Sequence, residues 1–176
     1  MLRKNNIKIK ENNKSIKEYK YLYNSIFKDK LDDKIIKTSL KNTFYSISIY
    51  ENNKIIGYGR LLGDGICYLH IHNIMVLKEY QSKGIGTLIM NNLLKKVETI
   101  KKTNPNLKIY LASIKGKESF YKKFGFFPRE ELNMGKVLML KWNVIFYSYK
   151  YILIRKERVL WKVKKKCFHT THYVTD

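Results

Sequence analysis

The segment Gln81-Ser82-Lys83-Gly84-Ile85-Gly86 has the residue types and spacing of a loop that holds phosphate. An apolar run precedes it and an amphipathic run follows it, so it should join a strand to a helix. Glycine lets the backbone turn sharply and approach a ligand closely. The first N–H groups of a helix lack partners within the helix, and the positive end of its dipole lies there. Such a loop can bind a pyrophosphate.

Two well-known phosphate loops do not match this segment. The dinucleotide-binding fingerprint needs three glycines, and the P-loop ends in Gly-Lys followed by Ser or Thr. The segment here has only Gly84 and Gly86. A tight strand-to-helix turn without any ligand is therefore an alternative that the loop alone leaves open.

Two histidines, His70 and His72, lie in the predicted strand before the loop. Residues two apart point to the same face of a strand. An imidazole with a pKa near 6.5 can act as a base at neutral pH. Strand histidines can equally face solvent or packing partners, and both interpretations stand. The acidic residues Glu79, Glu118 and Asp64 are weaker candidates, because they are more typical of surface charges.

The elements that must position these residues alternate between helices and strands. Apolar residues recur every three or four positions after Ser15, a typical N-cap, and predict an amphipathic helix. The pair Asn52-Asn53 between two alternating runs predicts a β-hairpin. We expect helices at 16–27, 32–40, 84–101 and 117–124, and strands at 6–10, 44–50, 55–62, 66–76, 107–113, from 126, and at 137–142. This order predicts an α/β (α+β) domain of three layers around a mostly antiparallel mixed sheet.

The composition indicates a folded and strongly basic protein. A length of 176 residues with 44% hydrophobic residues suits one α/β domain. The net charge of +22 would attract polyanions. However, lysine greatly outnumbers arginine, whereas arginine is favoured for bidentate base or phosphate recognition. We therefore attribute the charge mainly to a Lys-, Asn- and Ile-rich composition and expect no nucleic-acid partner.

Several classes of site and location are disfavoured. The two cysteines occur without a CxxC or HExxH pattern, so we expect neither a disulfide framework nor a metal site. The N-terminus has no apolar signal region, and no apolar run reaches the roughly 18 residues of a membrane span. A cytoplasmic protein without a membrane span is the expectation.

The chain is predicted to divide at residue 141. Residues 1–141 hold the strands, helices and motifs above, whereas 142–176 are basic and aromatic, with no glycine or proline. This second segment is expected to be an accessory or poorly ordered extension that the chemistry does not need.

Two motifs together resemble the GNAT N-acetyltransferase superfamily. The loop Gln81 to Gly86 matches its Gln/Arg-x-x-Gly-x-Gly/Ala signature, and residues 73–80 look like the strand and lead-in before it. One helix and one strand later, residues 118–126 look like the family's FYxKxGF segment. Two separated motifs in the right order are more specific than either alone. The resemblance covers about residues 5–141 and implies the GNAT three-layer fold.

The resemblance implies direct transfer of an acetyl group from acetyl-CoA to a primary amine of a small molecule, without a metal. Tyr121 would protonate the leaving CoA thiolate, as suits a phenol of pKa about 10. The run containing His70 and His72 is similar to the histidine pair of arylalkylamine N-acetyltransferases, which implies a base. The implied cofactor contacts are Ile74 and Val76, through backbone groups, and Gln81, Ser82, Lys83, Gly84, Ile85, Gly86 and Thr87 around the pyrophosphate.

The sequence also departs from the family and leaves alternatives. Many members carry an asparagine after the fifth strand, whereas residues 113–117 read Ser-Ile-Lys-Gly-Lys, and position 82 is Ser where many have Gly. The alternative functions are a GNAT-fold module without catalysis, which binds acyl-CoA or interacts with protein or nucleic acid, and a protein lysine acetyltransferase. A homodimer is common in the family, and the tail could mediate one. The tyrosines that could line the acceptor pocket or lie in the core are Tyr19, Tyr23, Tyr45 and Tyr58.

Overall fold

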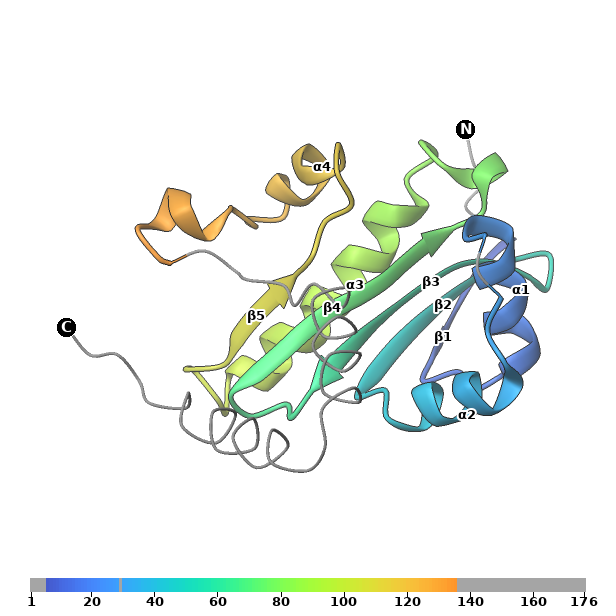
Figure 1. Ribbon diagram of the computed structural model, residues 1–176, viewed down its shortest axis with the longest axis horizontal. Helices are drawn as coiled ribbons and strands as arrows, with labels where there is room; N and C mark the ends of the chain where they lie inside the picture. The colour runs from blue at the N-terminus through green and yellow to red at the C-terminus, as the bar shows by residue number, and fades with distance from the viewer. Residues whose placement is uncertain (1–5, 29, 136–176) are drawn as a thin grey trace, which may run out of the picture. The chain divides into compact units, whose positions relative to one another are not determined.

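The computed structural model describes residues 6–28 and 30–135, and a five-stranded sheet is its central feature. Strands β1 to β4 pair antiparallel in chain order, and β5 pairs parallel to β4. Figure 1 shows this order across the sheet. The strands are β1 (Ile7–Glu11), β2 (Tyr45–Glu51), β3 (Lys54–Gly63), β4 (Tyr68–Val76) and β5 (Lys108–Leu111). The expected mostly antiparallel mixed sheet is confirmed.

Helices cover both faces of the sheet. Tyr58 of β3 packs edge-on against Tyr19 of α1, with ring centroids 5.2 Å apart. The next residue, Gly59, faces α3, because a Cβ there would lie 2.4 Å from the Cγ2 atom of Ile89. Adjacent strand residues point to opposite faces, so α1 and α3 form the outer two of three layers. The helices are α1 (Ile16–Ile26), α2 (Asp33–Lys41), α3 (Ile85–Lys101) and the short α4 (Glu118–Lys122).

Local sequence signals explain where the first elements begin and turn. The Ser15 hydroxyl accepts a hydrogen bond from the Glu18 N–H and caps α1, as expected. The Asp32 carboxylate does the same for the Lys34 N–H at α2. Asn52 and Asn53 take left-handed φ values of 49° and 64°, which is the backbone that a two-residue hairpin turn needs.

The described residues after 126 do not form the strand that the sequence predicted there. The chain divides into two units between residues 126 and 127. The strand expected from residue 126 is wrong, since the described part of the second unit contains only the 3₁₀ helix η3 (Arg129–Leu132). Pro128 explains this, because its fixed φ and missing N–H disfavour a strand, and its carbonyl instead accepts from the Glu131 N–H. The strand expected at 137–142 and the extension 142–176 lie outside the described residues.

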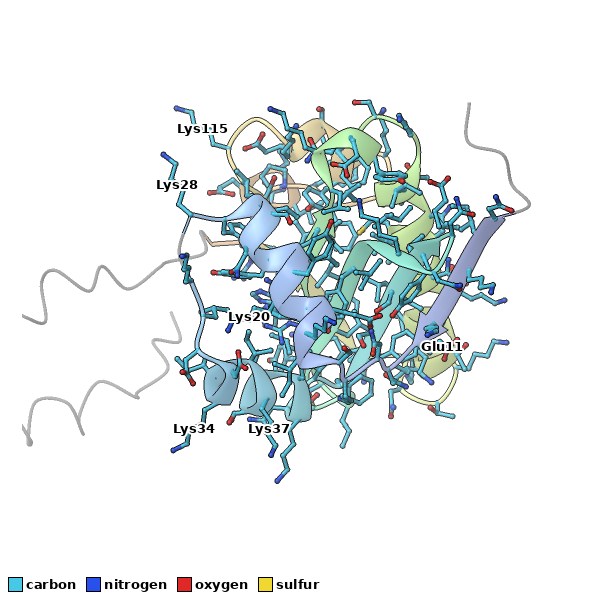
Figure 2. All side chains as sticks on the ribbon, turned by 90° about the vertical axis from the view of Figure 1, so that its right-hand side faces the viewer. Glu11, Lys20, Lys28, Lys34, Lys37 and Lys115 are labelled. Carbon is cyan, nitrogen blue, oxygen red and sulfur yellow. The ribbon has the colours of Figure 1, made fainter. Side chains whose placement is uncertain are left out.

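The surface of α1 and α2 is basic. Figure 2 shows Lys20 of α1 and Lys34 and Lys37 of α2 on the outside of the molecule. Lys20 forms an ion pair with Asp33. No helix in residues 6–28 or 30–135 is long and apolar enough to cross a membrane.

Candidate active site

One edge of β4 is free along its second half. Strand β5 pairs only with Tyr68 to Ile71 of β4, and the last pair joins Ile71 to Leu111. From His72 to Val76, no other described strand pairs with the edge of β4 that faces away from β3. Backbone N–H and C=O groups on an unpaired strand edge are available to a partner. This edge can therefore bind an extended ligand.

A β-bulge begins the free segment. Tyr58 pairs with Met75 and Arg60 pairs with His72, so β4 has one residue more than β3 in this stretch. Asn73 supplies the extra residue and takes a left-handed φ of 51°. Beyond the bulge, the Ile74 side chain lies on the α3 face, where its Cδ1 atom would be 2.8 Å from a Cβ on Gly59. The bulge thus turns residues 72 and 74 to opposite faces of the sheet.

The predicted phosphate loop connects this strand to α3. A 3₁₀ turn, η2 (Lys78–Tyr80), comes first, and Gly84 is the N-cap of α3 with a φ of 86°. A Cβ on Gly84 would meet no atom within 4 Å, so glycine is needed for its backbone and not for packing. Residues 81–84 and Thr87 are exposed, whereas Ile85 is buried. The loop that leads into α3 is therefore accessible, and the first amides of the helix have no partner within it.

Side chains tie the loop to the sheet. The Gln81 side-chain amide donates to the Val76 carbonyl at 3.1 Å. Lys83 lies over the Tyr80 ring, with its Nζ 5.5 Å from the centroid, and the Tyr80 hydroxyl donates to Glu51 at 2.7 Å. These contacts hold the loop against β2 and β4.

Helix α4 brings the second motif to the start of α3. A Cβ on Gly86 would lie 3.3 Å from the Cζ atom of Phe120, so glycine leaves room for that ring. Tyr121 packs edge-on against Phe120, with centroids 5.1 Å apart, and is half-buried. Its hydroxyl forms no hydrogen bond with another described residue. Burial raises the pKa of Tyr121 above its ordinary value of 10, so the phenol is protonated at neutral pH.

The two histidines share the opposite face from Ile74. His72 lies across from Arg60 and His70 across from Leu62. The two imidazole centroids are 6.1 Å apart, and His70 also stacks on Tyr110 at 5.3 Å. His72 is exposed as a residue, yet enough protein surrounds its ring that burial lowers its pKa below 6.5, with Arg60 and His70 adding to the effect. Its imidazole is therefore mainly neutral at pH 7.

Three of the four tyrosines left open by the sequence belong to the core. Tyr19, Tyr45 and Tyr58 are at most 5% exposed. Tyr45 lies near α3, where Lys96 contacts its ring. Only Tyr23 is half-buried, and its ring stacks on Tyr19 and packs at a tilt against Phe27.

The structure places the predicted cofactor residues along the free edge of β4 and the loop that follows it. The segment from Ile74 to Thr87 runs continuously from that edge to the exposed start of α3, and Phe120 joins it there. His70 and His72 lie on the other face. No group of three or more His, Cys, Asp or Glu side chains in the described ranges could hold a metal ion. Sequence reasoning missed Arg60 and Asn73, although a lone arginine inside the apolar run 55–62 was a signal.

A free strand edge that leads through a glycine loop into an exposed helix start defines a protein suited to an extended, phosphate-bearing ligand. A family model for the acetyltransferase (GNAT) domain matches residues 12–136. The chain therefore belongs to the GNAT acetyltransferase family, and the predicted family membership is confirmed.

Solved structures with the same fold agree. A probable acetyltransferase of unknown function from meticillin-resistant Staphylococcus aureus is 25% identical, with a TM-score of 0.65 over 77% of this chain and 99% of that one. The Escherichia coli ribosomal-protein-S18-alanine N-acetyltransferase is 15% identical, with a TM-score of 0.59 over 69% and 78%. An aminoglycoside N-acetyltransferase in complex with CoA is 12% identical, with a TM-score of 0.58 over 80% and 97%. No curated protein sequence matches this chain.

Proposed function

We propose that this protein is an acetyl-CoA-dependent N-acetyltransferase that moves an acetyl group directly to a primary amine of a small molecule. The observation that carries this proposal is the free edge of β4 from His72 to Val76, continuous with the exposed loop and the Gly84-led start of α3. Such a surface offers backbone groups to an extended pantetheine arm and unpaired helix amides to a pyrophosphate. The residues present fit acetyl-CoA, which supplies the acetyl group as a thioester.

His72 is the proposed base. A primary amine attacks a thioester only in its neutral form and must lose a proton as it does so. The lowered pKa of His72 keeps its imidazole neutral at pH 7, and its exposure leaves it open to an acceptor. Backbone N–H groups on the β4 edge would stabilise the developing oxyanion.

Tyr121 is the proposed acid. Its raised pKa keeps the phenol protonated, and its hydroxyl is not engaged by any other described residue. The phenol proton would pass to the sulfur as the carbon–sulfur bond breaks. One proton then leaves the amine and one joins the thiolate, so the protons balance and no covalent enzyme intermediate is needed.

A small amine is the proposed acceptor because of the histidine pair and its likeness to arylalkylamine N-acetyltransferases. The names of the structural neighbours include both an aminoglycoside acetyltransferase and a ribosomal-protein acetyltransferase, so they favour neither class. A free-thiol assay should compare small primary amines with lysine-containing basic peptides. Faster thiol release with peptides would favour a protein lysine acetyltransferase. Binding of acetyl-CoA without release for any acceptor would favour the module without catalysis.

Replacing Gly84 by alanine tests the cofactor site. The backbone there has a φ of 86°, so alanine should cost about 1–2 kcal/mol of stability. A Cβ would also project into the open space at the start of α3, and we expect the affinity for acetyl-CoA, measured by calorimetry, to fall at least about tenfold. Gly125→Ala is the matched control, because Gly125 has a φ of 82° and equally open surroundings. Equal affinities in the two variants would contradict the assignment.

The pH dependence of kcat tests His72. Because its pKa lies below 6.5, the neutral base should persist to lower pH, and the midpoint of the acid limb should fall below pH 6.5. We expect His72→Gln to remove this limb and to slow the reaction about tenfold, since solvent can still take the proton. Saturating amine should be used, so that the titration of the free amine does not enter. His70→Gln should keep the limb; loss of the limb in that variant alone would make His70 the base.

A further inference from the structure

We propose that Arg60 and Asn73 form a clamp that positions the free edge of β4 for acetyl transfer, which makes both of them positioning residues of the active site. The clamp is defined as the Arg60 guanidinium with its partners Asn73, Ser39 and Thr43. This inference rests on the proposed function and adds the device that holds the site in shape.

The Arg60 guanidinium joins two parts of the molecule that are distant in sequence. Its Nε donates to the Asn73 Oδ1 atom at 2.8 Å. Its Nη1 donates to the Ser39 Oγ atom at 2.7 Å, to the Ser39 carbonyl at 3.3 Å and to the Thr43 Oγ1 atom at 3.2 Å. Ser39 lies in the last turn of α2, and Thr43 follows that helix. One side chain therefore connects the end of α2 to the bulge of β4.

Arg60 is a buried charge whose burial does not by itself stabilise the fold. Arg60 is only 8% exposed, and no carboxylate among the described residues forms an ion pair with it. A buried charge held by neutral groups is seldom better for stability than an apolar side chain of similar size. The guanidinium also packs over the Tyr19 ring, with its Cζ 5.7 Å from the centroid. The N–H donors of a guanidinium lie in one rigid plane, so they fix the positions of the groups that accept from them. Here the Arg60 Nε fixes the position of the Asn73 side chain.

Asn73 is the residue that makes the bulge. Its left-handed φ of 51° is disfavoured for a side chain with a Cβ, although asparagine tolerates it better than most. Loss of the bulge would shift the register by one residue and turn the following side chains to the other face. The hydrogen bond from Arg60 opposes that shift, because it holds the Asn73 side chain on the α1 and α2 side of the sheet.

The clamp lies between the proposed base and the proposed cofactor edge. His72 precedes Asn73 and is paired with Arg60, whereas Ile74 follows Asn73 and its side chain points to α3. A shift of the bulge would therefore move the imidazole and the free backbone groups relative to each other. Displacements near 1 Å can cost about 100-fold in rate when reacting groups must align.

Asn73→Gly separates the hydrogen bond from the backbone conformation. Glycine adopts the left-handed φ without steric cost, so the bulge can still form while the bond to Arg60 is lost. The matched control is Asn52→Gly, because Asn52 has a φ of 49° and lies exposed in the β2–β3 turn. We expect Asn73→Gly to weaken acetyl-CoA binding about tenfold by calorimetry. We also expect faster amide hydrogen exchange at residues 74–76, and neither change in Asn52→Gly.

Two further variants keep the test decisive. Asn73→Asp retains an acceptor for Arg60 and should restore affinity to within about threefold of wild type. Arg60→Met should lower the affinity for acetyl-CoA as much as Asn73→Gly does. The double variant should bind acetyl-CoA no more weakly than the more affected single variant, since both changes remove the same contact. If Arg60→Met fails to fold, the comparison of Asn73→Gly with Asn73→Asp still tests the clamp.

Two outcomes would overturn the clamp, and a third would overturn the proposed function on which it rests. Wild-type affinity and exchange in Asn73→Gly would show that the contact positions nothing. Equal losses in Asn73→Asp and Asn73→Gly would show that the side chain does not act through Arg60. A wild-type protein that binds no acetyl-CoA would defeat the proposed function itself, and that failure is distinguishable because it is seen before any variant is made.

Discussion

Replacing Tyr121 by phenylalanine is expected to lower kcat about 100-fold, with little change in the affinity for acetyl-CoA or in the melting temperature. General acid catalysis typically contributes about 10²–10⁴-fold. The change removes only a hydroxyl that bonds no other described residue, while the ring keeps its contact with Phe120. Initial rates of thiol release at saturating acetyl-CoA and amine measure the effect, and calorimetry measures the affinity.

Tyr68→Phe is the control for this change. Tyr68 is an exposed tyrosine on β4 that stacks on Tyr110, and it too would lose a hydroxyl without losing its ring contact. Its kcat should stay within about twofold of wild type, because it has no part in proton transfer. An unchanged kcat in Tyr121→Phe would mean that water or another group protonates the thiolate. A lower affinity with unchanged kcat would assign Tyr121 to binding instead.

Local sequence signals predicted most of the elements. The 3.6-residue repeat and the glycine before it placed a helix at 84–101, and α3 spans Ile85–Lys101 with Gly84 as its cap. Ser15 and the pair Asn52-Asn53 placed a helix start and a hairpin turn, because each acts through hydrogen bonds or backbone preferences of near neighbours. The strand predicted from residue 126 was wrong because it rested on two aromatic residues alone. Pro128, two residues further on, disfavours a strand, and a 3₁₀ helix follows it.

The candidate site depends on contacts that cross the sequence, and only part of it could be predicted. The phosphate loop is local and was found directly. The approach of Phe120 to Gly86 joins α4 to α3, and only the family resemblance suggested it. The bulge at Asn73 was missed because the alternation around it fits an unbroken strand equally well. The hydrogen-bond partner of Asn73 is the Arg60 guanidinium, whose other partners lie in and after α2, far away in the sequence.

Gly59→Ala is expected to destabilise the protein by about 1–3 kcal/mol, as overpacking in a filled core does. The new Cβ would lie 2.4 Å from Ile89 Cγ2 and 2.8 Å from Ile74 Cδ1. Ile89 is buried on α3, and its branched side chain has little freedom in a helix. The gain of about 0.4–1 kcal/mol from reducing the freedom of the unfolded chain is too small to offset the clash. Urea denaturation measures the loss.

Gly135→Ala separates these two contributions. A Cβ on Gly135 would meet no atom within 4 Å, and its φ is not left-handed, so this variant should be neutral or slightly more stable. The difference between the two variants then measures the clash at Gly59. Because Ile74 is one of the displaced residues, Gly59→Ala should also weaken acetyl-CoA binding at temperatures where it remains folded. A stability equal to that of Gly135→Ala would mean that α3 can move away from β3 at no cost, and the start of α3 would then not be the fixed anion site that the proposed function requires.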